Sequence, residues 1–251
     1  FRNAPQSLGG QGAASVLRSL VDEYETADGV ALKDLPAAER EKLQKDPLAV
    51  ARDPRLYETV VLPGDNSSFI DYVYEPFKDG ADQVGKVGAS RTGYWAKKYL
   101  NEEDRSNNGN GSLYFPLYRY AEVLLDYVES LVETGDWQNP DVEKYINMIR
   151  NRAGMPNMDK AVYNTQEKVR ELYRRERRVE FAFEGKRYFD IRRWGIGNET
   201  MNGSALGAWN PTTNAYVQVE NRACTFPKYN AWPIPQTEET ANPNIEQPTG
   251  W

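Results

Sequence analysis

The clearest hydrophobic pattern in the chain lies between residues 114 and 194, where apolar positions recur at helical spacing. A first helix is predicted to begin at Pro116, because proline suits the opening turn, and to end at Gly135, a residue typical of helix ends. Its apolar positions predict one buried face, formed by Leu117, Tyr120, Leu124, Tyr127, Val128 and Leu131.

A second helix is predicted to follow Pro140 and to stop at Gly154. The turn before it is short and rich in Gly, Asn and Pro, so we expect the two helices to be antiparallel. Such a helical hairpin is the unit of tetratricopeptide-like arrays. The pattern therefore predicts a mainly α fold with a helical core at residues 114–194, while other parts of the chain read as long irregular loops with a few short strands.

The third predicted helix, Thr165 to Glu184, carries carboxylates on its apolar face. Glu176 and Glu180 fall inside the stripe of apolar residues, and together with Glu184 they form an i,i+4 line of like charges. Such a line destabilises a helix unless cations pair with it, and guanidinium groups suit partly buried pairing. We therefore predict a structural ion-pair network, with the cations supplied by Arg119, Arg150, Arg152, Arg177 and Arg187.

The same carboxylates have an alternative interpretation as a catalytic pair. Glycosidases combine an acid of raised pKa with an ionised carboxylate. However, an excess of arginines lowers carboxylate pKa values, which favours the structural network over an enzyme.

Shorter elements precede the helical core. Ser15 is a predicted N-cap for a helix that runs to about Glu25, and a charged helix is predicted from Ala37 to Lys45. The β-branched residues of segment 56–62 favour a strand.

The segment 63–90 contains several helix breakers and is predicted to be a long loop. It interleaves aromatic with hydrogen-bonding side chains, a combination that suits a sugar or an extended peptide. The candidate ligand contacts on it are Asn66, Phe69, Tyr72 and Tyr74. The alternative is that these aromatic rings pack the loop onto the body of the protein.

The chain after the helical core is again rich in Gly, Asn and Thr over residues 195–225, and Trp209 lies there. The last stretch, from residue 226, carries five prolines at positions 227, 233, 235, 243 and 248. We expect it to lie extended over the body, anchored by Trp232 and Trp251.

Composition and charge exclude several classes of site. The formal net charge is −6, which argues against a nucleic-acid-binding protein because such proteins need a basic face. The chain has no histidine, which excludes histidine-based catalytic triads and the usual zinc sites. It has a single cysteine, which excludes a disulfide within the chain. The loop at 101–112 lacks the spacing of an EF-hand calcium loop. No cofactor or metal ion is predicted.

An ordered set of motifs extends over nearly the whole chain. The central ones read RYAEVLLDYVESL, INMIRNRAGMP and RRERRVEFAFEGKRYFDIRRWG. Further motifs stand at 20–29, 53–55, 92–95, 232–235 and 242–251. In this order they resemble the C-terminal part of the SusD/RagB family of nutrient-binding outer-membrane lipoproteins.

The resemblance implies that residues 1–251 form a SusD-like C-terminal region, without the N-terminal half that carries a signal peptide, a lipid-bearing cysteine and further helical repeats. It implies a lipid-anchored, non-enzymatic protein of the outer-membrane cell surface. Its function would be to capture oligomeric nutrients, above all glycan oligosaccharides, and to deliver them to a SusC-like TonB-dependent outer-membrane transporter. Capture of oligopeptides and a lid without its own ligand site are the alternatives.

The first 13 residues form a polar, glycine-rich loop in the predicted arrangement. Sugar-binding members of the family often have an aromatic residue in this turn, and here the position corresponds to Gln11. The remaining candidate ligand contacts of the loop are Arg2, Asn3 and Gln11 itself. The polar residue at this position keeps the oligopeptide alternative open.

Overall fold

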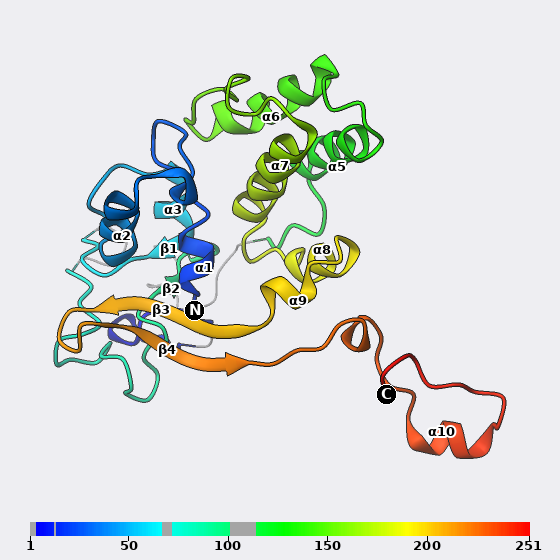
Figure 1. Ribbon diagram of the computed structural model, residues 1–251. Helices are drawn as coiled ribbons and strands as arrows, with labels where there is room; N and C mark the ends of the chain where they lie inside the picture. Colours follow the sequence, from blue (N-terminus) through cyan, green and yellow to red (C-terminus); the bar gives the residue numbers. More distant parts are fainter. Residues whose placement is uncertain (1–3, 13, 67–71, 101–113) are drawn as a thin grey trace.

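The computed structural model describes residues 4–12, 14–66, 72–100 and 114–251. Its longest helices, α5 (Tyr120–Glu133), α6 (Pro140–Arg152) and α7 (Gln166–Glu180), lie together at one end of the molecule (Figure 1). α5 and α6 pack together as the predicted hairpin, and α7 contacts both. The prediction of a mainly α fold with helical hairpins and a few short strands is confirmed.

The boundaries of α6 and α7 follow from local hydrogen bonds. Asn139 accepts a hydrogen bond from the backbone N–H of Asp141 at 3.0 Å, and Pro140 occupies the first turn of α6. Thr165 caps α7 in the same way, accepting from the backbone N–H of Lys168 at 3.3 Å. These caps satisfy backbone donors that have no partner inside the helix.

The first helix of the core differs from its prediction. α5 begins at Tyr120 rather than at Pro116, and its buried side turns toward Leu125 and Val132. Leu117 and Tyr120 of the predicted face are 81% and 65% exposed. Tyrosine has an apolar ring and a polar hydroxyl, so the pattern alone did not separate the buried side from the solvated one.

α7 also ends earlier than predicted. The helix stops at Glu180, and Phe183 adopts a positive φ of 64° in the turn that follows. The chain then enters α8 (Arg187–Arg193) and the short α9 (Gly197–Thr200). As a result, Glu184 lies beyond the helix end and not on its surface.

The segment before the core contains α1 (Arg18–Val21), η2 (Leu32–Asp34) and α2 (Ala37–Lys45), together with η1 (Gln6–Leu8). The bounds of α2 agree with the prediction. The helix predicted from Ser15 is only the single turn of α1, because Ser15 instead pairs with Trp95 in an isolated β-bridge.

The strand predicted at 56–62 is mostly a helix. α3 (Pro54–Thr59) begins where the Asp53 side chain accepts from the backbone N–H of Arg55 at 2.9 Å. This capping aspartate followed by proline outweighs the β-branched residues that suggested a strand. Only β1 (Val60–Val61) is extended, and it pairs antiparallel with β2 (Trp95–Ala96).

The longest strands lie in the segment that read as a loop. β3 (Gly203–Asn210) and β4 (Ala215–Arg222) form an antiparallel hairpin with irregular register near Leu206. Ala208 donates its backbone N–H to the carbonyl of Thr92 at 2.7 Å. This bond joins the hairpin to the segment that leads into β2.

Two apolar clusters meet along α7. Leu172 and Tyr173 pack with α5 and α6, whereas Val179 packs with α1, α3 and β3 through Tyr24 and Leu56. The carboxylates of α7 therefore lie at the junction between the helical layer and the rest of the fold.

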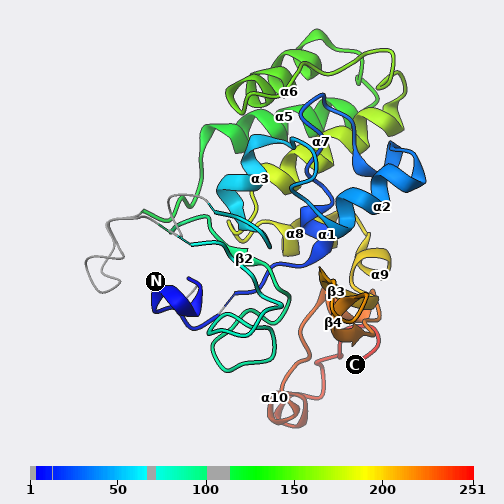
Figure 2. The same ribbon diagram turned by 90° about the vertical axis from the view of Figure 1, so that its left-hand side faces the viewer.

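The end of the chain was predicted wrongly. The segment that contains η3 (Lys228–Asn230) and α10 (Gln236–Ala241) projects away from the other elements in both views (Figures 1 and 2). Trp251 donates its ring N–H to the carbonyls of Lys228 and Ala231, so it anchors the segment to itself, and Trp232 is 82% exposed. No helix within the described ranges has both the length and the apolarity to cross a membrane.

Candidate functional site: an ion-pair network and an aromatic groove

Glu176 is the buried centre of an ion-pair network on α7. It accepts a hydrogen bond from Arg150 at 2.5 Å and forms an ion pair with Arg55 at 2.9 Å. Arg150 also pairs with Glu25 at 2.9 Å, and Glu25 pairs with Arg175 at 2.7 Å. Carboxylates and guanidinium groups therefore alternate through the interior, so each buried charge faces an opposite one.

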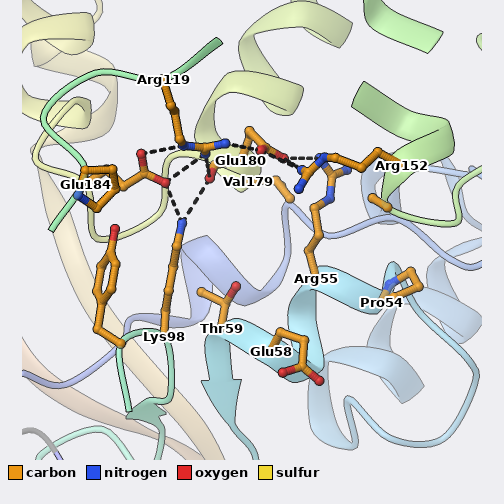
Figure 3. A pocket seen from close by; sticks show the side chains of 13 residues that line it. Pro54, Arg55, Glu58, Thr59, Lys98, Arg119, Arg152, Val179, Glu180 and Glu184 are labelled. Carbon is orange, nitrogen blue, oxygen red and sulfur yellow. Dashed lines mark hydrogen bonds and ion pairs between the residues drawn. The ribbon is translucent and has the colours of Figure 1, made fainter. Parts of the chain in front are cut away.

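The network continues into a cavity of about 450 Å³, shown in Figure 3. Glu180 pairs there with Arg119 at 2.5 Å, with Arg152 at 2.6 Å and with Arg55 at 3.2 Å. Glu184 accepts from Lys98 at 2.6 Å and from Arg119 at 2.8 Å. Arg119 thus bridges the two glutamates (Figure 3).

The electrostatics of this cavity do not suit a general acid. Burial raises the pKa of the Glu180 carboxyl, but the bonds and charges of Arg119, Arg152 and Arg55 outweigh this effect and hold the pKa below its ordinary value. A glycosidase acid needs a raised pKa. The arrangement is therefore suited to joining α7 to its neighbours.

The structure brings most of the predicted network residues together, namely Glu176, Glu180, Glu184, Arg119, Arg150 and Arg152. Arg177 differs, because it pairs with Asp190 at 2.9 Å and with Asp126 at 2.5 Å. Arg187 also differs, since none of the described residues forms an ion pair with it. Its guanidinium carbon lies 5.9 Å from the centre of the Trp194 ring.

A second candidate site is an aromatic groove outside the helical core. It has a volume of about 410 Å³ and lies between the end of α2, the loop after β1 and the tip of the β3–β4 hairpin. Trp209 and Phe77 are its partly exposed aromatic residues. The other lining residues include prolines and charged residues: Lys45, Asp46, Pro47, Pro63, Glu75, Pro76, Lys78 and Pro211.

Neighbouring side chains fix the ring of Trp209. The Lys45 ammonium lies 4.4 Å from the centre of this ring, and Tyr216 packs edge-on with ring centres 5.0 Å apart. An aromatic face with charged groups beside it suits a ligand that has both apolar faces and hydroxyl groups, as a pyranose does.

Of the predicted ligand residues that the structure describes, Tyr74 lines this groove, whereas Asn66, Tyr72 and Gln11 do not. Asn66 is exposed two residues after Gly64, which lines the groove. Gln11 is exposed in the N-terminal loop. The predicted contacts Arg2, Asn3 and Phe69 lie outside the described residues.

Two tyrosines of the loop instead hold it to the body of the protein. Tyr74 is fully buried and packs in a cluster with Trp95, although it also belongs to the lining of the aromatic groove, so its role as a ligand contact stays a prediction. Tyr72 is half-buried and donates its hydroxyl to Asp82 at 2.6 Å.

The sequence patterns had not selected Trp209 as a site residue, whereas Phe77 was one of the aromatic residues noted on the long loop. A usable signal for Trp209 was present, because the Asn-Pro-Thr-Thr-Asn turn at 210–214 precedes alternating residues typical of a hairpin strand. The place of Phe77 in the groove could not be predicted, since it depends on how the loop folds against the hairpin. Within the described ranges, no group of three or more Cys, Asp or Glu side chains could hold a metal ion.

Comparisons with known proteins agree with this fold. A crystal structure of a SusD-like carbohydrate-binding protein from Bacteroides fragilis superposes with a TM-score of 0.77 at 32% identity, over 97% of this chain and 50% of that one. A second SusD-like protein from the same organism gives a TM-score of 0.72 at 28% identity, over 96% and 48% of the two chains.

Sequence comparison gives the same assignment. SusD-like protein P2 of Formosa agariphila is 34% identical over 142 residues, which are 54% of this chain and 27% of that protein. The chain thus spans about half the length of the solved relatives, and its assignment to their C-terminal region stays a prediction. The model of the SusD family matches residues 1–251, so the chain belongs to the SusD family.

Proposed function

We propose that this protein captures oligosaccharides at the cell surface and is not an enzyme. The observation that carries the proposal is the aromatic groove, where Trp209 and Phe77 line about 410 Å³ of open space beside charged groups. Family membership supports the same class of function, since a similar solved protein is described as carbohydrate-binding.

In this proposal Trp209 provides the stacking surface for a sugar ring. Because Lys45 and Tyr216 hold its ring, little side-chain entropy is lost when a ligand binds. Lys45 and Asp46 lie where they can bond to sugar hydroxyls. Asn66 is retained as a further polar contact.

Four other predicted contacts remain part of the proposal without support from the groove: Gln11, Arg2, Asn3 and Phe69. In this proposal Tyr72 supports the loop. Its bond to Asp82 fixes the segment that leads to Phe77.

The wider role is also a proposal. We infer that the protein is lipid-anchored at the outer membrane and passes its ligand to a SusC-like TonB-dependent transporter. Co-purification of that transporter with the tagged protein from outer membranes is the direct test. Incubation with bound oligosaccharide followed by product analysis tests the non-enzymatic assignment, because a binding protein leaves the chain length of its ligand unchanged.

The deciding experiment is calorimetry of the purified protein against a panel of neutral oligosaccharides and a panel of mixed oligopeptides. We expect saturable oligosaccharide binding that Trp209→Ala weakens by about tenfold, the range of one aromatic contact. Trp232→Ala is the matched control, because Trp232 is 82% exposed and lies outside the groove.

Other outcomes would point elsewhere. Equal binding by wild type and Trp209→Ala would remove the groove as the site. Binding of peptides alone would replace the ligand class. No measurable binding to either the oligosaccharides or the oligopeptides would favour a lid subunit without its own ligand site.

A further inference from the structure

Arg187 is a half-buried cation without an ion-pair partner among the residues that the structure describes. Other arginines of the same region are paired: Arg18 with Asp22 at 3.4 Å, Arg177 with Asp190 at 2.9 Å, Arg222 with Glu220 at 2.5 Å, and Arg178 with Glu23. The guanidinium of Arg187 has only a distant contact with the ring of Trp194, at 5.9 Å. A half-buried guanidinium in this state retains most of its capacity to donate hydrogen bonds.

The carboxylates that act on Arg187 are already engaged. Glu23 is held by Arg178, and Asp190 is held by Arg177 and also by Arg193 at 2.9 Å. Burial, followed by the positive charge of Arg178, lowers the pKa of Arg187 to about 10. The group therefore stays charged at neutral pH in surroundings that favour an additional anion.

Arg187 lines two adjoining cavities of about 420 and 350 Å³, which share Leu17, Ser19 and Arg178 on their walls. They lie between α1, α7, α8, α9 and the start of β3, elements that are neighbours in both views (Figures 1 and 2). The Arg187 side chain thus borders open space in both cavities.

The two cavities differ in chemistry. The smaller one has an apolar wall of Val16, Leu20, Phe181 and Phe183. The larger one has the hydroxyl groups of Thr200 and Ser204, together with the exposed carboxylate of Glu199 and the carboxylate of Asp22, which pairs with Arg18. A ligand that fits both would carry a negative charge for Arg187, hydroxyl groups for the polar wall and a compact apolar face.

We propose that Arg187 anchors a second binding site, distinct from the aromatic groove, which takes the carboxylate of a uronic acid. The guanidinium fork pairs with the carboxylate in a bidentate manner, and the sugar hydroxyls bond to Ser204 and Thr200. The site does not rest on the aromatic groove, because the two regions share no lining residue.

The test is calorimetric titration of the purified protein with D-glucuronate, and with D-glucose as the neutral match. We expect saturable binding of glucuronate, no binding of glucose in the same range, and a loss of at least about tenfold in affinity for Arg187→Gln. Arg192→Gln is the matched control, since Arg192 lies on the same helix, loses the same charge and lines neither cavity.

Two further variants complete the binding experiment. Glu199→Gln should strengthen glucuronate binding, because it removes a like charge from the cavity wall. If Arg187→Gln does not fold, as judged by its thermal transition, the comparison of glucuronate with glucose and the effect of Glu199→Gln still decide the matter. Trp209→Ala should bind glucuronate as wild type does. The proposal of an oligosaccharide site in the aromatic groove and the proposal of a uronic acid site at Arg187 can therefore fail independently.

Three results would overturn the proposal. The first is equal affinity of wild type and folded Arg187→Gln for glucuronate. The second is binding of acetate or N-acetylalanine as tight as that of glucuronate, which would show a carboxylate site without selection for a sugar. The third is no binding of glucuronate at all.

Discussion

Arg150 donates a hydrogen bond to Glu176 over 2.5 Å with only 1% and 2% of the two side chains exposed. Glu176 faces Arg55 at 2.9 Å as well, so its carboxylate neutralises cations from α6 and α3 together. The pair therefore joins the helical layer to the N-terminal part of the fold through one side chain of α7.

Glu176→Ala is expected to lower the free energy of unfolding by about 3–5 kcal/mol, because it leaves Arg150 and Arg55 buried without this partner. Urea unfolding followed by circular dichroism measures the change. The matched control is Glu171→Ala on the same helix, whose ion pair with Lys33 is more than half exposed on both sides, at 55% and 52%. That control should cost less than about 1 kcal/mol.

A cost below about 0.5 kcal/mol for Glu176→Ala, within the range of ordinary surface changes, would contradict the buried network. A cost equal to that of Glu171→Ala would do the same, since it would place both carboxylates in water-like surroundings.

A second ion pair should make stability depend on pH. Glu133 accepts hydrogen bonds from Arg170 at 2.9 Å and from Tyr173 at 2.6 Å, and these contacts lower its pKa from 4.5 to about 2. Since the folded state has the lower pKa, the stabilisation is fully present above pH 4.5 and is lost as the pH falls toward 2. Water screens the pair, so its contribution is about 1 kcal/mol or less.

The measurement is the difference in free energy of unfolding between wild type and Glu133→Gln across that pH range. The difference should be largest near neutral pH and shrink steadily below pH 4.5, and 1 M NaCl should reduce it. A difference that stays constant from pH 6 to pH 3 would show that Glu133 titrates as it does in the unfolded chain.

The sequence predicted the carboxylate line on α7 because helical periodicity is a local property, and Glu176 and Glu180 stood inside an apolar stripe. It did not predict that Lys98 pairs with Glu184, which lies 86 residues away. The partner of a buried charge depends on tertiary packing. Arg187 shows the same limit in reverse, because proximity in sequence to the carboxylates did not bring it into the network.

The strands show a second limit. The β-branched residues of segment 56–62 suggested a strand, but only Val60 and Val61 are extended, since the cap at Asp53 and the proline after it start a helix. The sequence shows that Trp209 is aromatic, but it does not show that the ring lines a groove. That depends on the hairpin tip lying beside the end of α2 and Phe77. Helices of the core could be predicted to within a few residues, and the groove could not.

Asp82 should hold two loops together. It is 6% exposed and accepts hydrogen bonds from the Tyr72 hydroxyl at 2.6 Å and from the backbone N–H of Ser7 at 3.1 Å. Asp82→Ala leaves both donors without this acceptor and should cost about 1–3 kcal/mol. Hydrogen exchange at Ser7 should also become faster, which mass spectrometry of the N-terminal peptide would detect.

The control for this change is Asp79→Ala in the same loop. The Asp79 side chain is 92% exposed and its partner is Lys86 at 2.7 Å, so the substitution should leave the free energy of unfolding nearly unchanged. If Asp82→Ala and Asp79→Ala have the same effect, the bond to Ser7 does not hold the loops.

Gly207 is required for the contact between β3 and the segment before β2. A Cβ at this position would lie 2.2 Å from the carbonyl oxygen of Thr92, which is a backbone atom and cannot rotate away as a side chain could. Gly207→Ala should therefore lower the unfolding free energy by about 1–3 kcal/mol and loosen the bond from Ala208 to Thr92. Gly80→Ala is the control, because nothing lies within 4 Å of its Cβ, and it should be neutral or slightly stabilising. Equal thermal midpoints for the two variants would show that the hairpin can shift away from Thr92 without loss.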